Sequence, residues 1–108
     1  VTLPKQVSTR KMFTLDELKK YNGKDVKDKY YVSVGGKVFD VSNSDLYRPG
    51  NTYNHFVGHD ISYCFVIQSE KKEDLNKIDL NEGHLNDISE TVTFYECKYP
   101  LMGYLQEW

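Results

Sequence analysis

The stretch Tyr30-Tyr-Val-Ser-Val-Gly-Gly-Lys-Val-Phe-Asp-Val41 contains two runs of strand-forming residues separated by Gly35-Gly36. β-Branched and aromatic residues dominate both runs, as they do in β-strands. Glycine accepts the positive φ angles of a two-residue hairpin turn without steric cost. We therefore predict a β-hairpin over residues 30–41 at the centre of a small sheet.

A short helix is expected before this hairpin. Thr14 and Glu17 have the spacing of a capping box, in which each side chain bonds the backbone amide of the other residue. The pattern predicts a helix over about residues 15–21, stopped by Asn22-Gly23. Residues 1–12 lack periodicity and are interpreted as a lead-in to a single domain over residues 13–108.

Further helices are expected after the hairpin. A short helix at about 52–57 should end at Gly58-His59, with Asp60 capping a second one, and two helices joined in this way form a V that can grip a flat ligand. Residues 68–83 are mostly charged and should cross the surface. A final amphipathic helix ending near Pro100 is predicted from residues at helical spacing, namely Leu85, Ile88, Val92, Tyr95 and Tyr99. The fold class expected is α+β, with a small mixed sheet and short helices forming a ligand cleft.

Composition narrows the classes of function. Hydrophobic residues make up 39% and charged residues 28% of 108, which is typical of one globular domain. A net charge of −2 with dispersed lysines argues against nucleic acid as a partner. Nine tyrosines against one tryptophan favour a binding surface, because tyrosine combines a large ring with a hydrogen-bonding hydroxyl.

Motifs for hydrolytic or metal chemistry are weak or absent. The sequence has no G-x-S-x-G, phosphate loop or H-E-x-x-H, and His59 near Ser62 is more simply two neighbours on one turn. His55 and His59 have the i, i+4 spacing of metal ligands, but Gly58 interrupts them and no third ligand is near. Cys64 and Cys97 are expected to be reduced, half-buried residues.

Four motifs occur in order along the chain: Phe13-Thr-x-x-Glu-Leu18, Gly36-Lys-Val-Phe-Asp-Val41, Tyr47-x-Pro-x-x-x-Tyr53-x-x-Phe-x-Gly-His-Asp60 and Lys98-Tyr-Pro-x-x-Gly103. Together they resemble the cytochrome b5-like haem/steroid-binding domain. Within it, the nearest likeness is to the membrane-associated progesterone receptor family. The resemblance covers residues 13–105 and implies a cytochrome b5-like fold.

The resemblance also implies how iron would be held. An ordinary cytochrome b5 carries His-Pro-Gly-Gly after the corresponding strand, and that histidine is one of two haem ligands. Here Arg48-Pro-Gly-Asn51 takes its place, so the first imidazole is absent. In the progesterone-receptor relatives one tyrosine, corresponding to Tyr53, binds the iron of haem b. Tyrosinate is a hard anionic donor that favours ferric iron and suits electron shuttling poorly.

By the same resemblance, Tyr47, Lys98 and Tyr99 line the haem pocket beside Tyr53. Each residue also has a simpler interpretation: the tyrosines as packing or surface aromatics, and Lys98 as a cation that complements the end of a helix dipole. His59 is the alternative iron ligand, because Val-Gly-His resembles the setting of the second histidine in an ordinary cytochrome b5.

Three departures from the family pattern bear on haem binding. Arg48 replaces a glycine and would either pair with a haem propionate or obstruct the pocket rim. Tyr63 stands where the relatives have arginine, and Thr91 stands where they have tryptophan.

The leading hypothesis is a haem-binding module rather than an enzyme. The resemblance implies haem handling or regulation of haem-thiolate monooxygenases and sterol metabolism, with possible haem-stacked homodimers. It also implies tethering to an endomembrane by a segment before Val1, with secretion or a cytoplasmic location as alternatives. A haem-free module that binds a protein or a sterol-like ligand is the second hypothesis. An electron-transfer cytochrome is the third, and it would require His59 as a ligand.

Overall fold

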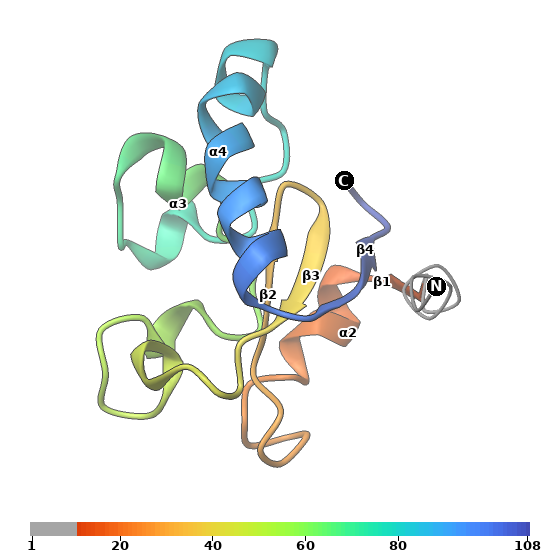
Figure 1. The fold of residues 1–108 in the computed structure, drawn as a ribbon, viewed down its shortest axis with the longest axis vertical. Coiled ribbons are helices and arrows are strands. Elements are labelled where there is room, and N and C mark those ends of the chain that lie inside the picture. The colour runs from red at the N-terminus through yellow and green to blue at the C-terminus, as the bar shows by residue number, and fades with distance from the viewer. Residues whose placement is uncertain (1–10) are drawn as a thin grey trace.

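The computed structural model describes residues 11–108, which form a mixed sheet with helices on both faces (Figure 1). The strand order is β1 (Lys11–Phe13), β4 (Leu101–Leu105), β3 (Lys37–Asp40) and β2 (Tyr31–Val34). β1 runs parallel to β4, whereas the other neighbouring pairs are antiparallel. The predicted lead-in lies outside the described residues except for Lys11 and Met12, which belong to β1.

The helices are α2 (Leu15–Lys19), α3 (Ser62–Ile67) and α4 (Glu82–Lys98), with 3₁₀ turns η1 (Asp45–Tyr47), η2 (Asn54–Phe56) and η3 (Lys72–Asp74). Figure 1 shows α3 and α4 side by side, with α2 beside β1. The expected α+β class is therefore confirmed.

Two small cores lie on opposite faces of the sheet, because successive side chains of a strand point to opposite sides. Val32 and Phe39 face the larger core, where they meet Tyr95 of α4. Tyr31 and Val38 belong to the smaller core with a second set of residues, Phe13, Leu18 and Leu105. The larger core is the one beneath the ligand pocket described below.

The predicted hairpin is confirmed. β2 and β3 pair from Tyr31 with Asp40 to Val34 with Lys37, and both turn glycines have positive φ. Gly36 has a second role, because a Cβ there would lie 2.5 Å from the indole of Trp108. The turn therefore needs glycine for its conformation and for its contact with the end of the chain.

Helix α2 differs from the prediction in two details. It ends at Lys19 rather than residue 21, because the chain at Asn22 already pairs as a bridge with Tyr30. The Thr14 hydroxyl accepts from the Glu17 amide at 3.0 Å, as a cap should. The Glu17 carboxylate accepts from that hydroxyl at 3.5 Å rather than from the Thr14 amide, so only half of the predicted capping box forms.

The helices predicted at 52–57 and after Asp60 also differ from those in the structure. The first is the single 3₁₀ turn η2, which is too short for an α-helix. The N-cap of α3 is Ile61 rather than Asp60. Asp60 still accepts from the Ser62 amide at 3.1 Å. It is fully buried, and its other carboxylate oxygen accepts from the Ser33 hydroxyl on β2 at 2.8 Å.

Helix α4 forms and ends before Pro100 as predicted. Ile88 and Tyr95 are buried, and Val92 and Tyr99 pack against the larger core. Leu85 does not follow this pattern, because it remains 40% exposed near the N-terminal end of the helix. The charged connection 68–83 holds one 3₁₀ turn, η3.

Candidate ligand pocket

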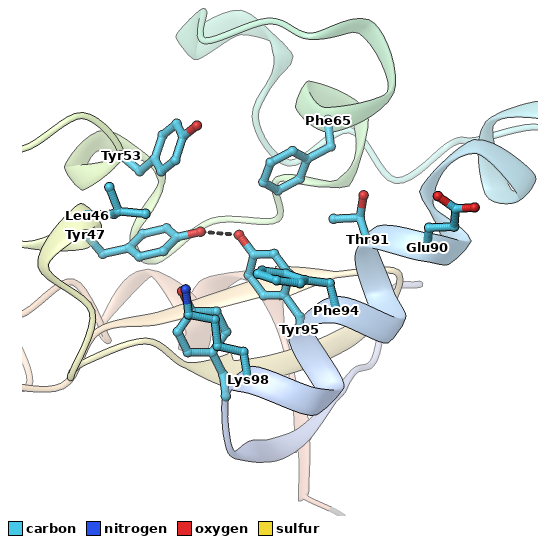
Figure 2. Close-up of a pocket in the computed structure, with 10 residues that line it drawn as sticks. Leu46, Tyr47, Tyr53, Phe65, Glu90, Thr91, Phe94, Tyr95 and Lys98 are labelled. Atoms are coloured by element: carbon cyan, nitrogen blue, oxygen red, sulfur yellow. Dashed lines mark hydrogen bonds between the residues drawn. The ribbon is translucent and has the colours of Figure 1, made fainter.

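A mainly apolar pocket of about 370 Å³ lies between the segment after β3, helix α3 and the outer side of α4 (Figure 2). Its lining residues are Leu46, Tyr47, Tyr53, Phe65, Glu90, Thr91, Phe94, Tyr95, Lys98 and Tyr99. The size falls in the range of small-molecule pockets, which are usually apolar with a few polar groups.

All four residues expected from the sequence to bind a cofactor line this pocket, namely Tyr47, Tyr53, Lys98 and Tyr99. The first two come from the loop after β3 and the last two from the end of α4. Within the loop, Gly50 takes a φ of +85° and the Tyr53 amide donates to the Leu46 carbonyl at 2.9 Å. The chain thus folds back on itself and brings the two rings within 5.8 Å of each other.

A pair of buried phenols forms the inner wall of the pocket. The hydroxyls of Tyr47 and Tyr95 share a hydrogen bond, drawn dashed in Figure 2. Burial is the largest cause that raises the pKa of both hydroxyls above the ordinary value, so both phenols stay neutral at physiological pH. Because one hydroxyl donates to the other, the second keeps its proton and can donate it to an oxygen of a ligand.

Tyr53 differs from the other pocket phenols. Its ring stacks on Phe56 at 5.4 Å, and its hydroxyl makes no hydrogen bond to any of residues 11–108. Tyr99, by contrast, donates weakly to Ser44 at 3.4 Å. Among the phenols that line the pocket, Tyr53 is therefore the one whose oxygen has no hydrogen-bond partner among the described residues.

The mouth of the pocket combines a cation with exposed apolar side chains. The Lys98 ammonium lies 5.3 Å from the centre of the Phe94 ring and has no carboxylate within ion-pair distance among the described residues. Phe94 is 54% and Leu46 45% exposed. This rim suits a ligand with an apolar body and an acidic group.

The three departures from the family pattern occupy different places. Thr91 lines the pocket, where a tryptophan would fill space. Arg48 is not part of the lining, and its Nε lies 3.7 Å from the Asp45 carboxylate. Tyr63 packs against His84 on a different surface, with the Lys77 ammonium 5.2 Å from its ring.

His59, the alternative iron ligand, is not among the residues that line this pocket. Its Nδ1 lies 3.0 Å from the side-chain amide nitrogen of Asn76. Ser62 accepts from the Gly35 amide and belongs to the Asp60 network instead of pairing with His59. Within the described residues there is no cluster of three or more His, Cys, Asp or Glu side chains that could hold a metal ion.

Tyr95, Leu46, Phe65, Glu90 and Phe94 were not expected at the site from the sequence. For the residues of α4, helical spacing from Lys98 was the available signal, because positions three, four and eight residues earlier share one side of a helix. Both cysteines are free, as expected, although Cys64 is buried and Cys97 is exposed rather than half-buried. No helix in the part of the chain described here is long and apolar enough to span a bilayer.

The family model for the Cytochrome b5-like Heme/Steroid binding domain matches residues 14–105. The chain belongs to this cytochrome b5-like family. Its similarity to probable steroid-binding protein 3 of Arabidopsis thaliana is 35% identity over 94 residues, covering 84% of this chain and 94% of that protein. Membrane-associated progesterone-binding protein 4 of the same plant is 30% identical over 105 residues, covering 94% of this chain. The chain spans only 43% of that second relative.

A solved structure of a cytochrome b5-like protein supports the same assignment. The solution structure of a putative steroid-binding protein from Arabidopsis matches with a TM-score of 0.76 at 33% identity. The match covers 89% of this chain and 97% of that one. The expected fold and the likeness to progesterone-receptor relatives are thus both confirmed.

Proposed function

We propose that this domain binds haem b in the pocket of Figure 2, with Tyr53 as the sole protein ligand of ferric iron. The observation that carries the proposal is the state of the pocket phenols. Tyr47 and Tyr95 bond each other and stay neutral, whereas the Tyr53 hydroxyl has no partner among residues 11–108. The oxygen of Tyr53, which has no hydrogen-bond partner among the described residues, is therefore better suited to bind a Lewis-acidic iron than the oxygens of the neutral, paired Tyr47 and Tyr95.

The donor set suits one tyrosine ligand rather than two histidines. His59 lies outside the lining of the pocket, and its Nδ1 is engaged by Asn76. The bound group would supply a ferric iron able to stabilise a phenolate. These features argue against an electron-transfer cytochrome, which needs two strong ligands.

Other residues of the pocket would orient the macrocycle. Lys98 at the mouth can pair with a propionate, since it has no ion-pair partner among the described residues. The Tyr47–Tyr95 pair can donate one hydrogen bond, and apolar contacts come from Leu46, Phe65, Phe94 and the ring of Tyr99. The cation of Arg48 is directed to Asp45, so we do not assign it a role on the ligand.

The test is an absorption titration of the purified domain with ferric haem, run beside Tyr53→Phe, Tyr47→Phe and His59→Ala. We expect a high-spin ferric spectrum with a charge-transfer band that disappears in Tyr53→Phe alone. Tyr47→Phe is the matched control, because it removes a hydroxyl from the same loop without removing the proposed ligand. An unchanged spectrum in Tyr53→Phe, or no Soret shift in the wild type, would refute the assignment.

The wider role proposed is haem handling or regulation of haem-thiolate monooxygenases in sterol metabolism, without catalysis by this domain. A haem held by a single protein ligand would also permit a haem-stacked homodimer. The name of the membrane-associated Arabidopsis relative favours a location at a membrane, and an endomembrane is the one that we propose. Co-purification of a monooxygenase with the wild type but not with Tyr53→Phe in haem-supplemented cells would support this role.

A haem-free sterol-binding module is the second candidate, and the apolar lining of the pocket favours it. The Arabidopsis relative of 35% identity is named a probable steroid-binding protein. Under this alternative the free proton of the Tyr47–Tyr95 pair would donate to a sterol oxygen. Saturable sterol binding by a colourless protein, weakened in Tyr95→Phe and unaffected in Tyr53→Phe, would favour it over haem.

A further inference from the structure

A second cavity, of about 310 Å³, shares no lining residue with the haem pocket. It lies among the loop before β2, the segment around η2 and the start of η3. Its lining residues are Asn22, Gly23, Lys24, Tyr30, Pro49, Asn54, His55, Val57, His59 and Lys72. It contains both histidines whose spacing suggested a metal site.

Apart from the phenol of Tyr30, the ionisable side chains of this lining are two lysines and two histidines. Lys24 and Lys72 are exposed, and neither forms an ion pair with another residue of the described chain. No Asp or Glu of residues 11–108 lines the cavity, and the carboxylate of Asp25, next to Lys24 in the chain, accepts from the side-chain amide of Asn22 at 3.3 Å. In a protein of net charge −2, such a concentration of cations creates a local positive potential.

The hydrogen bonds of Asn76 determine which nitrogen of His59 carries a proton. The Asn76 Oδ1 accepts from the Asp60 amide at 2.9 Å, so its Nδ2 is the group that faces His59. Because Nδ2 can only donate, His59 Nδ1 must accept. Burial and the nearby Lys19 lower the pKa of His59, so the neutral ring carries its proton on Nε2. That nitrogen is a donor.

His55 contributes an unsatisfied group. Its Nε2 is the one buried side-chain nitrogen or oxygen among residues 11–108 without a hydrogen-bond partner. Buried polar atoms usually have a partner, and an exception commonly marks a site for water or an ion. The His55 ring packs against Phe56 at 4.3 Å and forms part of the cavity wall.

These charges oppose the metal hypothesis and favour an anion. The ammonium groups of Lys24 and Lys72 would repel a metal cation, and no carboxylate in the lining offsets their positive charge. The two ammonium groups and the Nε2–H of His59 are donors that suit the oxygens of an anion. We propose that this cavity binds a phosphate-type oxyanion, either free or as the monoester of a small molecule held against Tyr30 and Pro49.

The experiment follows the three histidine Cε1–H resonances by NMR at constant pH and ionic strength. The probes are inorganic phosphate and phenyl phosphate, with chloride as the counter-titrant. We expect saturable shifts for His55 and His59 and none for His84, which caps α4 elsewhere. Tighter binding of phenyl phosphate identifies a monoester site, and equal binding identifies a free-anion site.

The variant Lys24→Gln/Lys72→Gln should raise the apparent Kd by roughly fivefold or more. The matched control Lys27→Gln/Lys71→Gln removes the same charge from exposed neighbours that do not line the cavity, and should leave the Kd unchanged. Absence of a saturable shift in the wild type, or equal losses in both variants, overturns the proposal. Haem titration of the same proteins should be unaffected, because the two cavities share no residue.

Discussion

Tyr47 and Tyr53 line the same pocket, but their hydroxyls have different partners. Tyr47 bonds Tyr95 inside the core, whereas Tyr53 has no partner among the described residues. The resemblance to the family predicts both residues at the pocket, because both belong to one motif of that family. It could not predict the bond to Tyr95, because that contact joins residues far apart in the chain and depends on how α4 packs.

Asp60 provides the clearest pH dependence at the scale of one residue. Burial raises the pKa of this carboxyl from 3.8 to about 6, although hydrogen bonds from Ser33 and Ser62 act in the opposite direction. A carboxyl with a higher pKa in the folded chain binds more protons when folded. Its contribution to stability is therefore complete below about pH 4 and is lost as the pH rises through 6.

We expect the free energy of unfolding of the wild type, relative to Asp60→Asn, to fall by roughly 2 to 3 kcal/mol between pH 4 and 7. Urea denaturation at several pH values measures this difference. Asp87→Asn, which changes an exposed carboxylate on α4, should show no such trend. If the difference in free energy of unfolding between wild type and Asp60→Asn did not change with pH, the buried carboxyl would not be the source of a pH-dependent stability.

At the scale of elements, local chemistry determines how well each one could be predicted. The hairpin was predicted correctly because Gly35-Gly36 defines its turn within a few residues. Strands β1 and β4 were not predicted, because each is short and depends on pairing across nearly the whole chain. Their identity as strands comes from tertiary contacts rather than from local propensity.

Gly103 pairs with Lys11 between β4 and β1, where there is no room for a Cβ atom. A Cβ there would lie 2.2 Å from the Lys11 carbonyl oxygen and 2.8 Å from the Phe13 ring. Gly103→Ala should lower the free energy of unfolding by about 1–3 kcal/mol, measured by urea denaturation, because β1 must separate from β4. The backbone amides of residues 11–13 should also become less protected from hydrogen exchange.

The variant Gly50→Ala is the control for Gly103→Ala, because it has the cost of an unfavourable backbone conformation without a steric clash. A Cβ at Gly50 would meet no atom of the described residues within 4 Å, but Gly50 has a φ of +85°. Its cost should be about 1–2 kcal/mol from backbone strain, with protection of β1 retained. Equal loss of β1 protection in both variants would contradict the steric explanation.

For the molecule as a whole, strands β2 and β3 contribute side chains to both cores, and the two cores support different parts of the structure. The larger core supports the pocket, and the smaller one packs α2 against the opposite face. Leu18 is fully buried in the smaller core and does not line the pocket. Stability and ligand binding should therefore respond differently to its loss.

Leu18→Ala should lower the free energy of unfolding by about 2–5 kcal/mol while leaving ligand affinity of the folded protein unchanged. Urea denaturation followed by Trp108 fluorescence and by circular dichroism should give one coincident transition, because β2 and β3 belong to both cores. Leu85→Ala, at an exposed position, is the control and should cost less than about 0.5 kcal/mol. Separate transitions would show that the cores unfold independently.

The strand order has a consequence for synthesis of the chain on the ribosome. β4 is the last strand to be made, yet it lies between β1 and β3. Until residues 101–105 emerge, β1 has no neighbour and the hairpin presents the open edge of β3, which can pair with other chains. The sheet can therefore close only after residues 101–105 have left the ribosome, so a shorter nascent chain cannot complete this fold.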